Sequence, residues 1–296
     1  MLLYEIIYKC NYRNNVKKKC EECNFVEFCH QDCKKCLEYV HYPEKNFEHR
    51  KYDCTHMADT YYCKYAFRYA SEIVYGLKRC MYITSITSKL RVMSIGCGPC
   101  TELAAIDYMR EKEKLKYSEL EFYGIDISGD VWNLIWNDIK QIYGDNVRIF
   151  KENVFKFVDE ILEKDWVPDL IILQYVFSDM RKKFNDEEIK KFIQKLADFI
   201  NTHNEKTIYV LGNDINLSVN YQGGREYFDI LYEKIKGAKK KPMHFLNANK
   251  ENHFEYGKEY KDNKLIFNEI SEDIKINYNP FDSCASAQIL IGRKKQ

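Results

Sequence analysis

The sequence lacks any apolar run long enough to cross a bilayer. No stretch approaches the roughly 18 consecutive apolar residues of a membrane-spanning helix, and the mean hydropathy is -0.54 with 31% charged residues. The first residues also lack a basic segment followed by a small-residue cleavage site, so they do not predict a signal peptide. These absences predict a globular, cytoplasmic protein with no membrane partner.

An excess of charge of one sign is also missing. Lys and Arg number 46 against 45 for Asp and Glu, so the net charge of +1 provides no long-range field for a polyanion. Only ten of the basic residues are Arg, whose planar guanidinium is the better reader of phosphates and bases. Local basic clusters still leave a nucleic-acid partner open, at Lys17–Lys19, Lys34–Lys35, Arg181–Lys183 and Lys239–Lys241.

Cysteine, in contrast, is abundant and unevenly placed. Eight of the twelve cysteines lie between Cys10 and Cys63. A reducing compartment is expected for a chain without an export signal, and clustered thiols there are more often metal ligands than disulfides. The head of the chain therefore predicts a metal-binding module.

Two CxxC pairs in this head lie close together. Each pair directs two thiolates at one point, and two pairs complete the tetrahedral shell that zinc prefers. The first predicted zinc site is Cys20, Cys23, Cys33 and Cys36. A second site could draw on Cys10, Cys29, His41 and Cys54, with His56 and Cys63 nearby. An iron–sulfur cluster and ordinary buried thiols are the alternatives.

The length of 296 residues predicts about two domains. We assign residues 1–57 to the cysteine-rich zinc-binding module and 58–90 to a connecting helix, with Asp53, Thr55 and Asp59 as candidate N-caps. The tyrosines of this helix recur at helical spacing, which favours packing in the core over stacking on bases. Residues 91–296 form the second domain, with an insertion at about 237–280.

From Arg91 onward short apolar runs alternate with helical stretches, the pattern of parallel βαβ units. The predicted strands are Val92–Ile95, Leu120–Ile125, Val147–Phe150, Asp169–Leu173, Thr207–Leu211 and Ala287–Ile291, with a short one at Leu265–Phe267. The predicted helices are Thr101–Lys114, Asp130–Tyr143, Asp186–Asn201 and Arg225–Ile235. The fold class is α/β, a Rossmann-like sheet with helices on both faces.

The first of these strands leads into a glycine loop that opens a helix. Gly96 and Gly98 allow a tight turn and close approach of a ligand to the helix N-terminus, although Thr101 replaces the third glycine of the dinucleotide fingerprint. The next strand ends at Asp126, whose carboxylate can bind a ribose diol. The alternatives are a plain strand-to-helix turn for the loop and a helix N-cap for Asp126.

These segments resemble the class I S-adenosylmethionine-dependent methyltransferases over about residues 91–293. Residues 92–99 are similar to their glycine loop, 122–128 to their second motif, 168–179 to the fourth strand with its active-site turn, and 288–293 to the last strand of the C-terminal hairpin. The resemblance implies S-adenosylmethionine as cofactor, with the ribose on Asp126, the adenine near Ile127, Asn153 and Val154, and the methionine part near the loop and Gln174. The full implied set is Ser94, Gly96, Cys97, Gly98, Asp126, Ile127, Asn153, Val154 and Gln174.

The sequence departs from that family at two positions. An acidic residue is commoner where this chain has Ser94, and an aspartate is commoner than Asn153. The turn after the fourth strand also lacks the Asn/Asp-Pro-Pro-aromatic pattern of enzymes that methylate exocyclic amines, and the Pro-Cys of those that methylate pyrimidine carbon 5. Both of these reactions are therefore disfavoured.

Methyl transfer is an in-line displacement, so the chief task is to align a nucleophile in a water-poor pocket. An alcohol or phenol acceptor also needs a base or an oriented acceptor of its proton. Tyr175 and Asp179 are the predicted catalytic residues, although Asp179 could instead cap a helix or pair with Arg181. Ser178 and Asp214 are further candidates at strand ends.

Three functions follow from this pattern. The favoured one is a methyltransferase whose zinc-binding head presents a macromolecule, RNA ahead of protein. The second is a methyltransferase for a small molecule, with the head as a lid or buttress. The third is a non-catalytic, methyltransferase-like binding or assembly factor.

Overall fold

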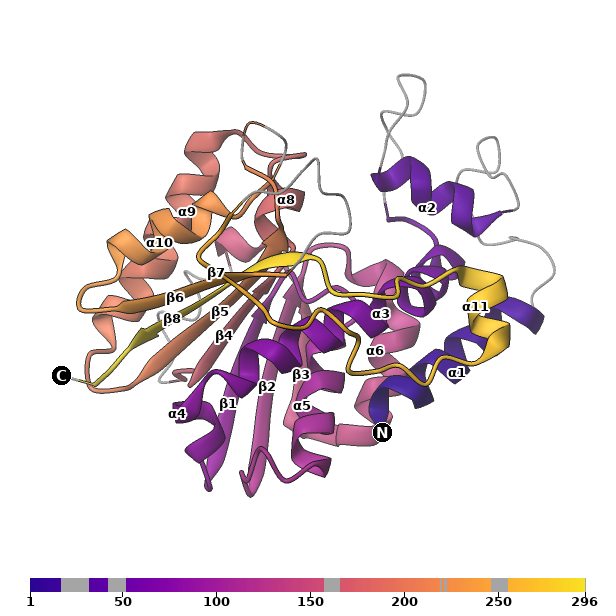
Figure 1. Cartoon of the computed structure of the whole chain (residues 1–296), viewed down its shortest axis with the longest axis horizontal. Helices are drawn as coiled ribbons and strands as arrows, with labels where there is room; N and C mark the ends of the chain where they lie inside the picture. The colour runs from indigo at the N-terminus through magenta and orange to yellow at the C-terminus, as the bar shows by residue number, and fades with distance from the viewer. Residues whose placement is uncertain are drawn as a thin grey trace.

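The computed structural model describes residues 1–16, 32–41, 52–156, 166–218, 220, 223–245 and 255–295. Its described strands form one sheet in the order β3-β2-β1-β4-β5-β8-β6-β7 (Figure 1). Their bounds are β1 Lys89–Ile95, β2 Glu119–Asp126, β3 Val147–Lys151, β4 Leu170–Gln174, β5 Ile208–Ile215, β6 Lys239–His244, β7 Lys258–Glu259 and β8 Ser286–Arg293. Strands β1 to β5 pair in parallel, and β8 lies antiparallel between β5 and β6. The prediction of an α/β, Rossmann-like sheet is confirmed.

Helices cover both faces of this sheet. On one face α1, α3, α5 and α6 share an apolar core with alternate side chains of the central strands, among them Val92, Phe122 and Ile172. On the other face α8, α9 and α10 pack on the intervening side chains, among them Met93 and Ile171. The bounds are α1 Leu2–Val16, α3 Thr55–Lys78, α4 Met81–Ser85, α5 Thr101–Glu111, α6 Gly129–Tyr143, α8 Val176–Met180, α9 Asp186–Thr202, α10 Glu226–Lys234 and α11 Glu272–Tyr278. No described helix is long and apolar enough to cross a membrane.

Helix α1 belongs to the core of the sheet domain, although the sequence analysis places residues 1–57 in a separate module. Leu3, Ile6 and Cys10 of this helix are fully buried in the core that α3 and α5 share. Within the predicted module, residues 17–31 and 42–51 lie outside the described residues. Helix α1 is therefore part of the sheet domain, and a separate module over residues 17–57 stays a prediction.

Helix α3 is longer than a connector needs to be, and it crosses the sheet face in Figure 1. Its N-cap is Cys54, which makes no side-chain capping hydrogen bond, so none of the candidate caps Asp53, Thr55 and Asp59 occupies the cap position. Asp59 instead accepts hydrogen bonds from Arg13 of α1. The helix therefore starts at a cysteine whose side chain does not cap it.

The predicted insertion at 237–280 contributes to the sheet. Strand β6 pairs with β8 from Lys239 to His244, although its sequence of three lysines and a proline has no apolar alternation that would predict a strand. Leu265–Phe267 is not a strand, and beside it Lys264 forms an isolated bridge with Ser283. Strand β6 therefore joins the sheet through its backbone pairing with β8.

Helix α2, Cys33–His41, lies apart from the sheet and packs on the start of α3 (Figure 1). Its buried residues Cys36 and Leu37 form a small apolar cluster with Cys54, Met57 and Tyr65. Asp32 begins the helix, because its Oδ1 accepts a hydrogen bond from the Lys34 amide at 3.0 Å.

Candidate functional site

A cavity of about 620 Å³ lies at the carboxyl ends of β1, β2 and β4. The sheet order changes direction at this point, and ligands of open α/β sheets bind at such switch points. Ten of the predicted site residues line the cavity: Gly96, Cys97, Gly98, Asp126, Ile127, Asn153, Val154, Gln174, Tyr175 and Asp179. Ser94 is buried within β1 and does not line it.

The loop from β1 to α5 depends on its glycines. Gly96 and Gly98 have φ of +63° and +47°, which an L side chain adopts only with strain. A Cβ on Gly96 would also lie 3.0 Å from Val176 Cγ2. Cys100 takes the left-handed conformation at the helix N-cap, and its amide donates to the Cys97 carbonyl at 2.8 Å. The loop therefore forms a tight turn with its backbone against the cavity.

Asp126 ties this loop to the end of β2. Its Oδ2 accepts the Gly98 amide at 3.0 Å, and its Oδ1 accepts the Ser128 amide at 2.7 Å. Burial raises the pKa of the carboxyl group, and these two backbone donors oppose that rise. Ser128 itself is the N-cap of α6, so Asp126 reaches the helix start as well as the loop.

The far end of the cavity is formed by residues after β2 and β3. Ile127 is 54% exposed, which leaves an apolar face in the cavity wall for a planar group. Asn153 accepts the Phe155 amide on its Oδ1 at 2.9 Å, and Val154 and Phe155 also line the wall. Asn153 thus shapes the local turn, and its side-chain oxygen is already engaged.

Gln174, at the end of β4, lines the cavity and makes hydrogen bonds to α3 and α5. Its Nε2 donates to the Tyr69 carbonyl of α3 at 2.9 Å, and its Oε1 accepts the Thr101 hydroxyl of α5 at 3.2 Å. Beside it, the Ser94 hydroxyl donates to the carboxylate of Glu102, which lines the cavity and is 1% exposed. Glu102 is not among the residues predicted from the sequence, although an acidic residue in the first turn after the glycine loop is a visible signal.

The two predicted catalytic residues have different surroundings. The Tyr175 hydroxyl donates to Glu72 Oε2 at 2.8 Å, and burial raises its pKa well above the ordinary value. Glu72 is fully buried and also accepts from Asn213 Nδ2 at 2.8 Å. Asp179 is half exposed at the cavity and pairs with Lys182 at 2.8 Å, not with Arg181. Asp214, in contrast, accepts the Ser178 amide and is fully buried.

An aromatic wall closes one side of the cavity. It consists of Tyr52, Tyr61, Tyr69 and Trp132. Tyr61 and Trp132 meet at 5.3 Å between ring centroids, and Tyr69 lies 4.5 Å from Tyr175. The helical spacing assigns the tyrosines of α3 to the core, which holds for Tyr62 and Tyr65 but not for Tyr69, which lines the cavity. Only the crossing of α3 over the strand ends shows which tyrosines face the cavity.

The predicted metal ligands are partly outside the described residues. Cys20, Cys23 and Cys29 lie there, while Cys33 and Cys36 share the first turn of α2 as expected. Cys54 packs beside Cys36 in the small cluster under α2. Within the part of the chain that the structure describes, no three His, Cys, Asp or Glu side chains are grouped to hold a metal.

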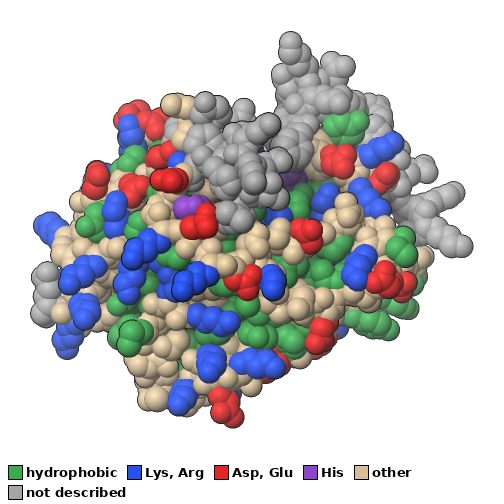
Figure 2. Space-filling view, viewed as in Figure 1, with side chains coloured by type: hydrophobic (Ala, Val, Ile, Leu, Met, Phe, Trp, Pro, Cys, Tyr) green, Lys and Arg blue, Asp and Glu red, His purple; other side chains and the backbone are tan. Residues whose placement is uncertain are grey.

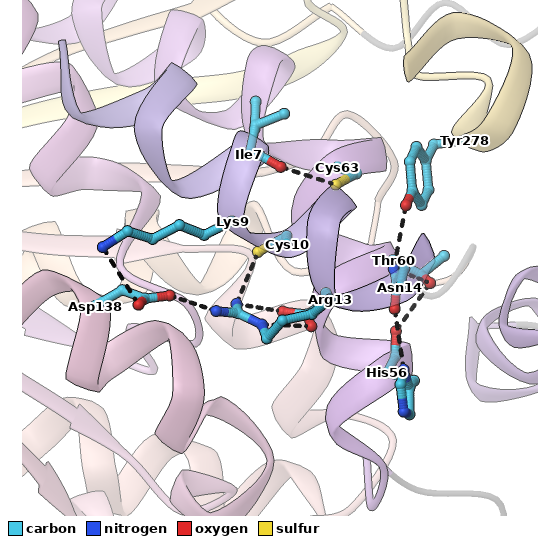
Figure 3. A network of polar contacts seen from close by, with 11 residues as sticks. Ile7, Lys9, Cys10, Arg13, Asn14, His56, Thr60, Cys63, Asp138 and Tyr278 are labelled. Atoms are coloured by element: carbon cyan, nitrogen blue, oxygen red, sulfur yellow. Dashed lines mark hydrogen bonds and ion pairs between the residues drawn. The ribbon is translucent and has the colours of Figure 1, made fainter. Parts of the chain in front are cut away.

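The second predicted metal site is not assembled by its described members. Cys10 lies in the core between α1 and α3, where Arg13 Nη2 is 3.3 Å from its Sγ and burial raises the pKa of its thiol (Figure 3). His41 instead stacks on Tyr65, with its Nε2 3.0 Å from the Tyr52 hydroxyl. Cys10, His41 and Cys54 therefore do not form one ligand set, because Cys10 belongs to the main core and the other two to the surroundings of α2.

No family model matches the sequence, and no curated protein matches it. Among solved structures, a SAM dependent methyltransferase from Archaeoglobus fulgidus is 13% identical, with 76% of this chain and 94% of that chain covered and a TM-score of 0.43. A precorrin-6y C5,15-methyltransferase from Geobacter metallireducens is 11% identical, with 75% and 88% covered and a TM-score of 0.40. A spermidine synthase from Thermotoga maritima is 10% identical, with 78% and 60% covered and a TM-score of 0.40. Similarity at this level assigns no activity to the chain.

Proposed function

We propose that the chain is an S-adenosylmethionine-dependent methyltransferase. The observation that carries this proposal is the position of Asp126, whose carboxylate lies at the end of β2 beside the glycine loop and lines a 620 Å³ cavity. A carboxylate at this edge of an open sheet binds the hydroxyls of a ribose. A cavity of this size accommodates a ligand of drug-like dimensions.

The residues of the cavity fit this cofactor at both ends. Ile127, Val154 and Phe155 offer apolar contact to the adenine. At the other end Gly96 and Gly98 allow the methionine part to approach the backbone closely. Trp132, beside Gly98 in the wall, has a buried indole N–H without a hydrogen-bond partner, and such a donor suits an oxygen of a ligand.

The bound cofactor supplies an activated methyl group on a sulfonium centre. The chain's own contribution is to exclude water and to orient the acceptor in line with that group. We propose that Asp179 accepts a hydrogen bond from the methyl acceptor, because its carboxylate is half exposed at the cavity beside Tyr175 and Val176. Tyr175 is proposed to form the floor, since its hydroxyl already donates to Glu72.

We propose a macromolecular acceptor, RNA ahead of protein. Exposed lysines support this, at Lys34 and Lys35 on α2 and at Lys239–Lys241 on β6. In Figure 2 Lys and Arg side chains gather over the left and centre of the face in view. The aromatic wall of the cavity favours an acceptor that inserts a flat unsaturated group, such as a base.

The same wall supports a small aromatic molecule as the second candidate acceptor. Labelled methyl transfer into RNA, protein and metabolite fractions separates the two.

We also propose zinc in the head, held by Cys33 and Cys36 together with Cys20 and Cys23. The shared helical turn of Cys33 and Cys36 supports it.

Titration calorimetry with S-adenosylhomocysteine tests the cofactor proposal. Asp126→Asn should weaken binding at least about 100-fold, because it removes a charged acceptor for two ribose hydroxyls. The matched control is Asp130→Asn, since Asp130 is 73% exposed on α6 and pairs with Lys151. No binding to the unaltered protein would make the assembly-factor function the leading one.

A further inference from the structure

The glycine loop and the start of α5 look at first like a site for phosphate. Free amides behind a strand favour an anion, as in nucleotide-binding proteins. In this chain, however, the Gly98 amide already donates to Asp126, and Cys97 donates its amide to the Ile125 carbonyl at 3.0 Å. Two of the backbone donors that could hold a phosphate are therefore taken by the protein itself.

The first turn of α5 also carries a buried carboxylate, Glu102. Other buried carboxylates of the described chain have a basic partner or several donors: Asp59 pairs with Arg13, and Asp169 pairs with Lys206. Glu102 accepts from the Ser94 hydroxyl and from its own backbone amide, and neither donor is charged. The titratable groups close enough to interact electrostatically with Glu102 are Cys97 and Cys100 of the loop, Tyr62 of α3 and Asp126 of β2, and none of them is basic.

A buried carboxylate without a cation is costly unless a proton or a ligand neutralises it. Because Glu102 lines the cavity beside the loop, a ligand can provide that charge. A phosphate at the same place would meet Glu102 and Asp126 as like charges.

We infer that Glu102 is a specificity-determining residue, which selects a ligand with an ammonium group at the glycine loop and rejects one with a phosphate there. This inference rests on the proposed function and names a contact within it. It separates a cofactor that ends in an amino acid from nucleotides that share the adenosine part.

The test is calorimetry of the whole chain with three adenosine ligands. S-adenosylhomocysteine carries the ammonium, methylthioadenosine lacks the amino-acid part, and AMP carries a phosphate. The variant is Glu102→Gln, which keeps the shape and removes the charge. The control is Glu111→Gln at the end of the same helix, where the side chain is 45% exposed and lies 3.3 Å from the N-terminal amine.

Glu102→Gln should raise the Kd of S-adenosylhomocysteine by about 10- to 100-fold and change that of methylthioadenosine by less than about twofold. AMP should bind the variant more tightly than the unaltered protein, and Glu111→Gln should change none of the three. Unchanged binding of S-adenosylhomocysteine and AMP in Glu102→Gln would overturn the inference and leave the proposed function standing.

The AMP measurement distinguishes a failure of the proposed function from a failure of the inference about Glu102. If no form of the protein binds S-adenosylhomocysteine, the proposed function fails. AMP binding that appears only in Glu102→Gln would then still support the rejection of phosphate. AMP binding that is absent, or equal in all forms, would overturn the inference.

The unaltered protein gives a second readout if the variant does not fold. Burial raises the pKa of Glu102 to about 7. Protonation below that pH removes the charge, so the preference for S-adenosylhomocysteine over methylthioadenosine should fall about tenfold per pH unit. A preference that stays constant from about pH 8 to about pH 5 contradicts the role of Glu102.

Discussion

Replacing Arg13 with methionine should reveal how α1 is fixed to the fold. The guanidinium forms a fork on Asp59 of α3, with Nε 2.8 Å from Oδ2 and Nη2 2.6 Å from Oδ1, and its Nη1 lies 2.6 Å from Asp138 Oδ2 of α6 (Figure 3). The Asp59 side chain is only 2% exposed, so the variant leaves a buried carboxylate without its partner. Breaking a buried pair in this way costs about 3–5 kcal/mol. Asp138 is 14% exposed, and water compensates part of its loss.

Urea unfolding of a double-mutant cycle measures this cost. Arg13→Met with Asp59→Asn should recover a large part of the lost stability, because no charge is then stranded. Lys9→Met is the control: Lys9 lies 3.4 Å from Asp138 at 30% exposure, and its loss should cost under about 1 kcal/mol. If the double variant is as unstable as Arg13→Met alone, a stranded charge is not the cause and the reasoning fails.

Three further predictions concern the pocket and the head. Folding raises the pKa of Glu102 from 4.5 to about 7, so between these pH values the folded state keeps a proton that the unfolded chain loses. The free energy of unfolding should therefore fall as the pH rises from about 4.5 to about 7. In Glu102→Gln it should fall less, and urea titrations at about pH 5 and about pH 7.5 can check this. Asp179→Asn should slow single-turnover methyl transfer at least about 100-fold without weakening the binding of S-adenosylhomocysteine. Tyr175→Phe should lower the free energy of unfolding by about 1 kcal/mol and change the rate of methyl transfer little. Equal rates in Asp179→Asn and the unaltered protein would show that another residue contacts the methyl acceptor. Cys36→Ser should lose zinc by elemental analysis while Cys10→Ser keeps it, and zinc retained in both would exclude Cys36 as a ligand.

The parts of the fold that the sequence predicted have local signals. The first four residues of β4 are an apolar run, and α9 begins with a capping box in which Asn185 and Glu188 exchange hydrogen bonds. Strand β6 has no such signal, because its lysines point to no buried face and its partner β8 is remote in sequence. Helix α1 has one as well, since Leu3, Ile6 and Cys10 recur at helical spacing, although no helix is predicted there.

Some residues of the site could likewise be predicted from local sequence signals, and others could not. The glycine loop and Asp126 belong to one strand–helix–strand unit, so their order along the chain was enough to bring them together. The hydrogen bond of Tyr175 could not be predicted from the order of the elements, because its partner Glu72 lies on α3, 103 residues earlier. The aromatic wall is equally hidden, since Tyr52, Tyr61 and Trp132 meet only when α3 is placed across the sheet.

Helix α3 therefore links the core to the pocket, and it is more than a connector between two domains. Its buried Asp59 holds α1 through Arg13, its carbonyl at Tyr69 holds Gln174, and its Glu72 holds Tyr175. Each of these contacts is a hydrogen bond or ion pair to a different element, so a shift of α3 would disturb all of them together. Packing of α2 on the first turns of the same helix brings His41 next to Tyr52 and Tyr65. Helix α3 therefore connects the surroundings of α2 to the aromatic wall of the cavity.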